Sequence, residues 1–401
     1  MTRVLVLSEA SVNLPHRRPY EALARRPGWE VHIACVERIP VGNGSFKECS
    51  PAPPGAAYRL HTVPWHLAGS QRLSWFGHLG ELIRQVRPGV IFVEHDPGCV
   101  LVLQAAVLGR LYGARVVPFT PENIERNRWH DALRGLRRGD PKGVARDAVI
   151  AALNGAGRVA SDGLAVMTRE AQAIFERAWG QDKPMVIVPL GTDMELFRPM
   201  DVGELRAELG LNGKFVVGYF GRLVPEKGVD LIIEAVSALP ARFHLLLDMF
   251  KNFAPGSYAA DLMAQIDRHR MRDRVAVIDV AHDEVPRYMN CCDVVALPSR
   301  TVERWKEQFG RVLPEAMACE VAVVGSSSGN IPDMIGDAGL VVPEGSAEAL
   351  SEAFKKLEAD PDLRQTLGRK GRERVEEFLS VRRQTDMLVE LFSRVLEREG
   401  Q

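Results

Sequence analysis

The sequence predicts an α/β protein made of two Rossmann-like domains, each a doubly wound parallel sheet, that face a central cleft. At 401 residues the chain is longer than a single hydrophobic core usually supports. Short, nearly continuous apolar runs alternate with longer segments of helical spacing, which is typical of buried parallel strands joined by helices. The alternation restarts after a turn-rich segment at Val186–Pro199, so we place the hinge between the domains there.

The first domain is predicted from apolar runs that lack the polar alternation of a half-exposed sheet. The predicted strands are Val4–Ser8, Val31–Val36, Val90–Glu94, Arg115–Phe119 and Leu164–Met167. The segments between or after them that carry helical spacing are Arg17–Arg26, Leu73–Val86, Gly98–Tyr112 and Arg169–Trp179. We assign residues 1–185 to this domain.

The second domain repeats the pattern over residues 186–378, followed by a helical stretch over 379–401. Its predicted strands are Phe215–Phe220, Phe243–Asp248, Val275–Ile278, Asp293–Pro298 and Val321–Ser326. Its predicted helices are Gly228–Leu239, Ser257–Arg270, Asp283–Cys291 and Ser346–Ala359, and two more in Asp362–Arg398 that are broken around Leu379–Ser380.

Composition excludes several classes of protein. The formal net charge of −1 gives no electrostatic reason to expect a nucleic-acid partner. Six scattered cysteines, without a C-x-x-C pair, predict buried, reduced thiols. The apolar part of the N-terminal segment is too short for a signal peptide, and no run of 18 uncharged apolar residues exists. We therefore expect a cytoplasmic protein, attached at most to the inner face of the membrane.

The segment Trp305–Gly329 contains the first candidate ligand-binding residues. Glu307 and Glu315 flank seven residues that begin with Gln308-Phe309-Gly310, and Pro314 predicts the first turn of a helix. A helix N-terminus preceded by glycine favours a phosphate, because its free N–H groups and its dipole both attract negative charge. Two carboxylates beside such a terminus indicate a site for a nucleotide sugar.

A second segment, Gly218–Val236, supplies cations. A predicted strand ends at Phe220, Gly221 turns the chain, and Arg222 and Lys227 follow on a loop. Ligands of open α/β sheets bind beyond the carboxyl ends of the strands, and an arginine with a lysine suits a diphosphate. The alternative is a pair of solvated loop cations, with Lys227 paired to Glu226 or Glu234.

Together these segments resemble the retaining, nucleotide-sugar-dependent glycosyltransferases of family 4, which have the GT-B fold. The matching motifs are GRLVPEKG at Gly221–Gly228 and EQFGRVLPEAMACEVAVVGSSSG at Glu307–Gly329. The resemblance is specific across Val186–Gly345 and rests mainly on the strand–helix pattern before that. It implies that the first domain binds the acceptor, that the second binds the donor, and that the final helix over 379–401 returns to the first domain.

The resemblance implies metal-independent transfer of a sugar from a UDP- or GDP-sugar to a hydroxyl acceptor, with no other cofactor. Arg222 and Lys227 would hold the diphosphate, Glu307 the transferred sugar and Glu315 the ribose. Backbone atoms near Val280–His282 would meet the base. The remaining predicted donor contacts are Gly221, Val280, Gln308, Phe309, Gly310 and Arg311.

The chain departs from the family pattern at several positions. Glu320 stands where the family has a glycine, so we expect a different backbone there. Asn330 replaces a second glycine after Gly329, as the next best residue for positive φ. Met249–Phe253 replaces a glycine-rich turn after Asp248, and the double glycine after the first strand is missing.

Candidate acceptor-side residues are His16, Glu122 and Asn123, which follow predicted strands; helix capping is the alternative for the latter two. The single D-x-D motif, Asp360-Pro361-Asp362, is predicted to begin a helix and not to bind metal.

The segment Arg126–Arg146 contains seven basic residues interleaved with Trp129, Leu133 and Leu136. It predicts either peripheral contact with an anionic membrane or an ordinary solvated helix. Two rival functions also stay open. One is a nucleotide-sugar epimerase on the same fold, against which the spacing of Glu307 and Glu315 speaks. The other is a catalytically inactive nucleotide-sugar-binding subunit.

Overall fold

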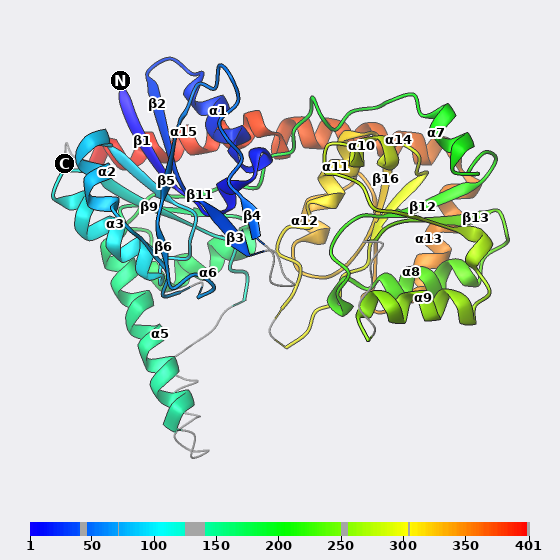
Figure 1. Ribbon diagram of the computed structural model, residues 1–401. Coiled ribbons are helices and arrows are strands. Elements are labelled where there is room, and N and C mark those ends of the chain that lie inside the picture. Colours follow the sequence, from blue (N-terminus) through cyan, green and yellow to red (C-terminus); the bar gives the residue numbers. More distant parts are fainter. Residues whose placement is uncertain (41–45, 71, 125–140, 250–255, 304, 399–401) are drawn as a thin grey trace. The chain divides into compact units, whose positions relative to one another are not determined.

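A computed structural model describes residues 1–40, 46–70, 72–124, 141–249, 256–303 and 305–398. The chain divides into two compact units, Met1–Pro189 with Gln384–Gln401, and Leu190–Arg383. Figure 1 shows that each unit contains its own twisted sheet flanked by helices. The boundaries expected from the sequence, 185/186 and 378/379, stay a prediction.

The first unit is built on a seven-stranded parallel sheet with the strand order β11-β10-β9-β8-β1-β2-β5. Central β1 pairs with β2 and with β8, so that Val4 lies opposite both Val31 and Val90. All four residues of β8 are buried, which explains why the run is apolar throughout. The strands are β1 Thr2–Leu7, β2 Trp29–Val36, β5 Arg59–Val63, β8 Val90–Val93, β9 Arg115–Thr120, β10 Leu164–Val166 and β11 Met185–Ile187.

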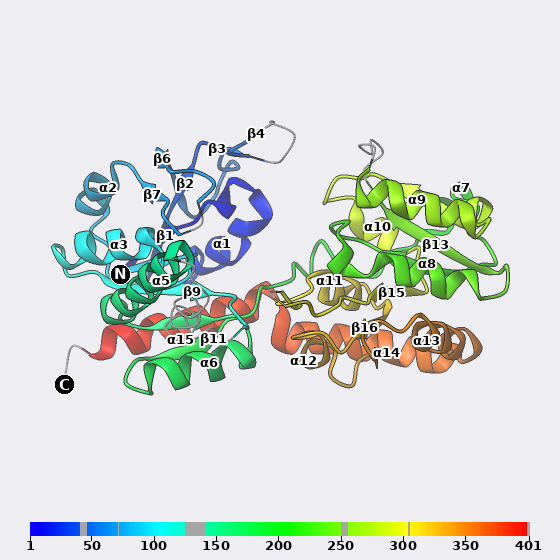
Figure 2. The same ribbon diagram turned by 90° about the horizontal axis from the view of Figure 1, so that it is seen from below.

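Helices cover both faces of this sheet (Figure 2). Ile91 and Val93 join a core with residues of α2 and α3, whereas Phe92 on the opposite face contacts Tyr20 of α1 and Phe392 of α15. Thr168 caps α6 by accepting a hydrogen bond from the Ala171 amide. The helices are α1 Arg18–Ala24, α2 Leu79–Val86, α3 Val100–Arg110, α5 Pro141–Ala160, α6 Arg169–Trp179 and α15 Val381–Glu397, with a 3₁₀ turn at Leu14–Arg17.

The expected helix over Leu73–Val86 is wrong in its first part. Trp75 and Phe76 form β7 (Trp75–Phe76), which pairs with β6 (Trp65–His66), and α2 begins only at Leu79. The Gln104 side chain accepts a hydrogen bond from the Phe76 amide and donates one to the Phe76 carbonyl. The Phe76 backbone therefore needs no partner within a helix. A second hairpin, β3 (Arg38–Pro40) with β4 (Phe46–Glu48), was also not predicted.

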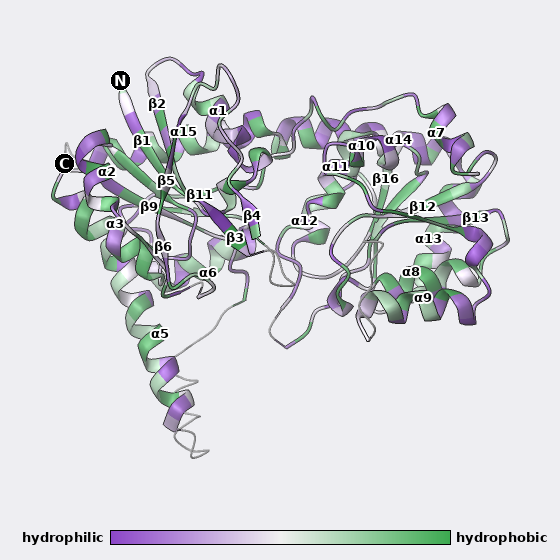
Figure 3. Ribbon diagram, viewed as in Figure 1, coloured by the Kyte–Doolittle hydropathy of each residue, from purple (hydrophilic) through white to green (hydrophobic). Residues whose placement is uncertain are grey.

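The second unit contains a six-stranded parallel sheet with the order β14-β13-β12-β15-β16-β17. Val217 of β12 lies opposite Leu245 on one side and Val294 on the other. The strands of both sheets are mostly hydrophobic, as Figure 3 shows. The strands are β12 Phe215–Tyr219, β13 Phe243–Asp248, β14 Val275–Ile278, β15 Val294–Leu297, β16 Ala322–Ser326 and β17 Leu340–Val342.

The four helices expected in this unit are confirmed, and Asp360 caps α14 by accepting a hydrogen bond from the Leu363 amide. That cap confirms the expected helix start at Asp360–Asp362. The helices are α7 Gly203–Glu208, α8 Val229–Ser237, α9 Tyr258–Arg268, α10 Val285–Met289, α11 Val312–Ala318, α12 Ile331–Ile335, α13 Ala347–Ala359 and α14 Pro361–Arg374; a π-helical turn, Val375–Leu379, precedes α15.

Two expectations about the backbone are wrong. Glu320 keeps the left-handed conformation of a glycine, with φ of 60°, because Gly368 of α14 packs directly on its carbonyl. Asn330 has φ of −84° and precedes α12 as its N-cap. The positive φ at this turn belongs to Gly329, where an added Cβ would lie 2.0 Å from the Glu307 carbonyl oxygen.

The cysteines are free, and five of the six are buried, as expected. No described helix is both long and apolar enough to cross a membrane. Of the basic segment Arg126–Arg146, residues 126–140 lie outside the described residues, and the rest begins α5. Most of the turn after Asp248 also lies outside them.

Candidate active site

Three segments of the second unit meet beyond the carboxyl ends of neighbouring strands. The loop after β12 carries Arg222 and Lys227, the loop after β15 carries Glu307, and the turn after β16 carries Gly329. Because β15 pairs with both β12 and β16, parallel pairing brings these three loops to one edge of the sheet.

Lys227 and Glu307 form an ion pair at the centre of this edge. Lys227 Nζ lies 2.5 Å from Glu307 Oε2, and the two side chains are only 12% and 5% exposed. Ser299 Oγ donates a second hydrogen bond of 2.7 Å to the same oxygen. The pairing of Lys227 with Glu226 or Glu234 that the sequence left open is therefore replaced by a contact with a residue 80 positions away.

The turn after β16 fixes the backbone of Glu307. The Asn330 amide donates to the Glu307 carbonyl at 3.0 Å, and the Glu307 amide donates to Ser328 Oγ at 3.4 Å. Ser326 Oγ donates to the Ser299 carbonyl at 2.5 Å, which ties the two loops together. Small side chains followed by glycine let the two backbones approach closely, which is the physical reason for the run Ser326-Ser327-Ser328-Gly329.

Arg222 follows Gly221, whose φ is 148°, and its side chain is exposed at the same edge. Tyr219 OH donates to the Arg222 carbonyl at 2.7 Å and so anchors the turn. Burial, together with the nearby Glu307 carboxylate, raises the pKa of Tyr219, which keeps this phenol a hydrogen-bond donor.

The segment after Glu307 turns at Gly310, with φ of 69°, into α11, which contains Pro314 in its first turn as expected. Phe309 is buried, and Gln308 is partly buried. Glu315 Oε1 lies 3.6 Å from Arg311 Nε and 3.8 Å from His282 Nε2. The predicted base-contacting segment near Val280–His282 and the predicted ribose-binding Glu315 therefore lie together.

The strand ends beside this segment carry two acids. Burial, reinforced by the Asp279 carboxylate, raises the pKa of Asp248 to about 6, although the Val280 backbone opposes this by hydrogen bonding. Asp248 lies opposite Ile278, so Val280 follows the neighbouring strand at the same edge. Among the described residues, no group of three or more His, Cys, Asp or Glu side chains is placed to hold a metal ion. Metal independence stays a prediction.

In the first unit, polar side chains gather where β8 ends. His95 Nε2 lies 2.6 Å from Glu9 Oε2, and the neighbouring Glu94 accepts a hydrogen bond from Tyr20 OH. Burial alone would lower the pKa of His95, but hydrogen bonds with Cys99 and Glu9 raise it to about 10. Burial raises the pKa of Glu94 as well. The spacing of these residues in the sequence did not predict that His95 pairs with Glu9 or Glu94 with Tyr20.

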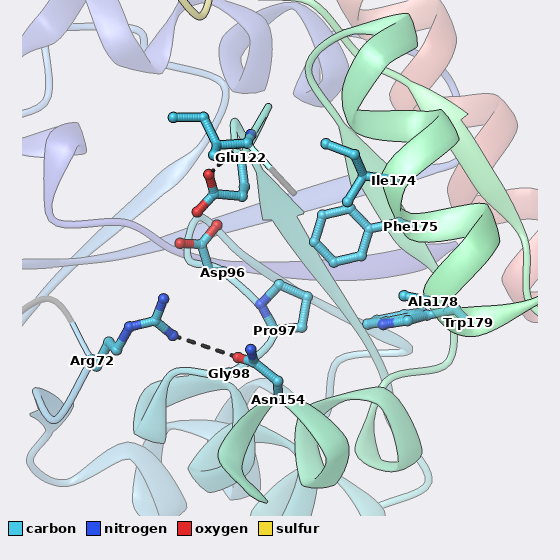
Figure 4. A pocket seen from close by; sticks show the side chains of 11 residues that line it. Arg72, Asp96, Pro97, Gly98, Glu122, Asn154, Ile174, Phe175, Ala178 and Trp179 are labelled. Atoms are coloured by element: carbon cyan, nitrogen blue, oxygen red, sulfur yellow. Dashed lines mark hydrogen bonds between the residues drawn. The ribbon is translucent and has the colours of Figure 1, made fainter. Parts of the chain in front are cut away.

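A pocket of about 140 Å³ opens beside the ends of β8 and β9. Figure 4 shows acidic and amide groups on one side and an aromatic wall on the other. Glu122 lines this pocket, whereas the buried Asn123 and the partly buried His16 do not. Its lining residues are Arg72, Asp96, Pro97, Gly98, Glu122, Ile124, Asn154, Ile174, Phe175, Ala178 and Trp179.

Comparison with known proteins gives this arrangement a family context. Residues 201–374 match the family model for glycosyl transferases group 1. This group 1 domain contains every predicted donor contact from Gly221 to Glu315. A D-inositol 3-phosphate glycosyltransferase from Saccharomonospora viridis is 31% identical over 217 residues, covering 50% of this chain and 48% of the relative. An alpha-D-kanosaminyltransferase from Streptomyces kanamyceticus is 31% identical over 167 residues, or 41% and 42% of the two chains.

The chain spans about half the length of the curated relatives that it matches. Solved structures match over nearly all of it. Sucrose-phosphate synthase from Thermosynechococcus elongatus has a TM-score of 0.72 at 20% identity and covers 99% of this chain and 100% of its own. Anabaena HepE in complex with UDP and glucose has a TM-score of 0.71 at 19% identity, with coverage of 98% and 100%. These similarities show the fold: two Rossmann-like domains, as in GT-B glycosyltransferases.

Proposed function

We propose that this protein is a retaining glycosyltransferase of family 4 that moves a sugar from a UDP- or GDP-sugar to a hydroxyl acceptor without a metal ion. The observation that carries the proposal is the buried Lys227–Glu307 pair, held by Ser299 and lying at the strand edge that also presents Arg222. The donor would bind the second unit and the acceptor the first.

The chemistry follows from the charge that develops on the leaving group. A nucleoside diphosphate departs as an anion, and Arg222 and Lys227 would stabilise it, as a metal ion does in other enzymes. Glu307 would exchange part of its contact with Lys227 for a hydroxyl of the transferred sugar. Glu315 would accept hydrogen bonds from the ribose. Fixed donors that need no reorganisation supply most of such a catalytic effect.

The relatives support the reaction class and a choice of donors. One that is 31% identical over 206 residues, from Mycobacterium tuberculosis, is named as a GDP-mannose-dependent mannosyltransferase, and the structure of HepE contains UDP and glucose.

The two alternative functions, an epimerase and an inactive subunit, differ from this proposal in what they require of the site and in what they release. An epimerase needs an acid–base pair at the sugar, and the observed pairing occupies Glu307 with a cation. An inactive nucleotide-sugar-binding subunit would bind the donor and release no nucleoside diphosphate, with or without an acceptor.

The deciding experiment compares donor turnover in matched variants. With a panel of UDP- and GDP-sugars, the protein should release the nucleoside diphosphate, and an acceptor should increase that release. Arg222→Ala and Lys227→Ala should each lower turnover by roughly 10²–10³-fold, whereas Lys355→Ala, an exposed site on α13, should match the parent. Near-parental rates in folded Arg222→Ala and Lys227→Ala would refute the proposed roles. Conversion of the nucleotide sugar into its epimer, without net release of nucleoside diphosphate, would favour the epimerase.

We also propose a cytoplasmic location, with peripheral membrane contact through Arg126–Arg146. Sedimentation with vesicles of anionic lipid at low salt tests the contact; a protein that stays in the supernatant contradicts it.

A further inference from the structure

Two cysteines of the first unit place their sulfur atoms in contact. Cys35 lies on β2 and Cys49 follows β4, and the two Sγ atoms are 3.1 Å apart. Both residues are free thiols. A disulfide bond is about 2.05 Å long, so the sulfur atoms need to approach each other by about 1 Å to form one. Cys35 is fully buried, whereas Cys49 is partly exposed, so a small reagent can reach one thiol while the second lies against it.

The backbone around the two thiols holds them in place. Cys35 lies opposite Thr62 in the parallel pairing of β2 with β5. The Cys49 amide donates a hydrogen bond of 2.7 Å to the carbonyl of Glu37, the residue that follows β2. Between the two cysteines, β3 and β4 pair as an antiparallel hairpin. The thiols therefore meet through sheet and hairpin pairing, and a disulfide between them requires no change of strand partners.

A buried arginine lies against the more accessible thiol. Arg17 is only 1% exposed, and its Nη2 donates to Cys49 Sγ at 3.2 Å. None of its other described partners is a carboxylate. A buried charge is costly unless it is paired, and among these partners a thiol, with an ordinary pKa of about 8.5, ionises more readily than a phenol, at about 10. The other partners are the carbonyl groups of Ser11, Val12, Ser50 and Pro51 and the hydroxyl of Tyr58.

The two thiols differ in the way that oxidation to a disulfide requires. The guanidinium of Arg17 favours the thiolate of Cys49, which is the nucleophilic form. Ionisation would give up the 3.6 Å contact of the Cys49 thiol with the Ser50 carbonyl and make the hydrogen bond from Arg17 charge-assisted. Burial, reinforced by the hydrogen bond with Cys49, raises the pKa of Cys35 against the opposing effect of Arg17. Cys35 therefore stays a protonated thiol beside its partner.

We propose that Cys35 and Cys49 are a redox-sensitive pair, in which a hydroperoxide oxidises Cys49 and Cys35 then closes a reversible disulfide. In the first step the Cys49 thiolate attacks one peroxide oxygen, the O–O bond breaks, and Cys49 becomes a sulfenic acid as hydroxide leaves. In the second step the Cys35 sulfur attacks the Cys49 sulfur, and the Cys35 proton leaves with the sulfenic hydroxyl as water. In total, two thiols and one hydrogen peroxide give one disulfide and two waters.

This proposal concerns thiol chemistry in the first unit alone and does not depend on the proposed function. Disulfides of proteins kept in a reducing compartment are mostly transient and redox-sensing, and partly exposed thiols beside a cation are the reactive ones. The other four cysteines, Cys99, Cys291, Cys292 and Cys319, are buried.

The test exposes the fully reduced full chain to a small excess of hydrogen peroxide and counts thiols after denaturation. The count should fall from six to four, and proteolytic mapping should find a cross-link between Cys35 and Cys49. Dithiothreitol should restore all six thiols. Cys291→Ser, which removes one of two adjacent thiols in the second unit, is the matched control: it should lose two thiols and form the same cross-link as the parent.

Variants separate the roles of the three residues. Cys35→Ser should stop at the sulfenic acid, which dimedone traps on Cys49, whereas Cys49→Ser should form neither the sulfenic acid nor the cross-link. Arg17→Gln should slow the loss of thiols by about 3- to 10-fold, because it lowers the thiolate fraction of Cys49 more than it raises the reactivity of each thiolate.

The mapping of the parent chain decides the proposal even if a variant does not fold. Retention of six thiols by the parent, or a cross-link that joins other cysteines, would overturn it. Dimedone found on another cysteine of folded Cys35→Ser would do the same. An unchanged rate in folded Arg17→Gln would refute the activation of Cys49 by Arg17.

Discussion

At the scale of single residues, Lys227 is held by two partners of different kinds. Its ammonium lies between the Glu307 carboxylate and the face of the Trp305 ring, 5.2 Å from the ring centroid. A cation over an aromatic face and beside a carboxylate is held without the mobility of a surface lysine. Under the proposed function, this fixed cation would receive the donor diphosphate.

Removing this cation should destabilise the second unit. Lys227→Met leaves the buried Glu307 carboxylate without its cation, so we expect a loss of about 3–5 kcal/mol in the free energy of unfolding. The double change Lys227→Met with Glu307→Gln should lose less than the sum of the single changes, by about 1 kcal/mol or more. Urea unfolding measures both. The exposed pair Lys355–Glu352 is the matched control, with coupling below about 0.5 kcal/mol. Additive losses at residues 227 and 307 would show that the two do not interact.

Glu320 gives a second prediction at this scale. Its positive φ costs an L-residue roughly 1 kcal/mol, and the long contact of this exposed side chain with the half-buried Arg372, at 3.8 Å, offsets little of it. Glu320→Gly should raise the free energy of unfolding by up to about 1 kcal/mol, whereas Glu320→Ala, which keeps the Cβ, should not. Thermal unfolding compares the two; equal stability of the glycine and alanine variants would show that the backbone is unstrained.

At the scale of elements, the edge of the first sheet carries a titratable pair. His32 of β2 and His61 of β5 stack with ring centroids 5.2 Å apart, and their facing nitrogens lie 2.9 Å apart. Burial lowers the pKa of both rings, against the opposing effect of Glu30 on His32, and the nearby His32 ring further lowers the pKa of His61. The pairing of β2 with β5 thus holds two neutral imidazoles.

Because these histidines take up protons more readily in the unfolded chain, their contribution to stability is present above about pH 6.5 and is lost as the pH falls below it. The melting temperature should therefore fall between pH 7.5 and pH 5, and the double change His32→Asn with His61→Asn should flatten this dependence. His78→Asn, at an exposed position, is the control. A parental slope in the double variant would contradict the assignment.

At the scale of the whole molecule, the end of the chain completes the first unit. Leu388, Leu391 and Phe392 of α15 are fully buried, and the Phe392 ring contacts Trp29 and Phe92 from two strands of the sheet. The last helix is therefore part of a core formed with residues 300 or more positions earlier.

Phe392→Ala should lower the stability of the first unit by about 3–5 kcal/mol, because it leaves a cavity in a close-packed core. Hydrogen exchange read separately over the two units should show lost protection in β1 and β8 with unchanged protection in β12 and β15. The control is Phe46→Ala, at an exposed ring, which should cost no more than about 1 kcal/mol. Equal loss of protection in both units would show that they unfold together.

The sequence by itself predicted five strands of each sheet and singled out the two segments that meet at one edge of the second sheet. Runs such as Val90–Glu94 and caps such as Asp360 are encoded within a few neighbouring residues, so periodicity and local hydrogen bonding suffice to predict them. The motifs at Gly221–Gly228 and Glu307–Gly329 could be identified because each lies within one continuous segment.

Tertiary structure alone decided which groups meet. Lys227 pairs with Glu307, and not with Glu226 or Glu234, because β12 and β15 lie side by side and their loops meet. Trp75 and Phe76 form a hairpin strand in place of the expected helix because the Gln104 side chain of α3 hydrogen-bonds to the Phe76 backbone. The pocket of Asp96, Glu122 and Phe175 exists only where strand ends and α6 come together. Partners of this kind depend on strand order and packing, which no local pattern contains.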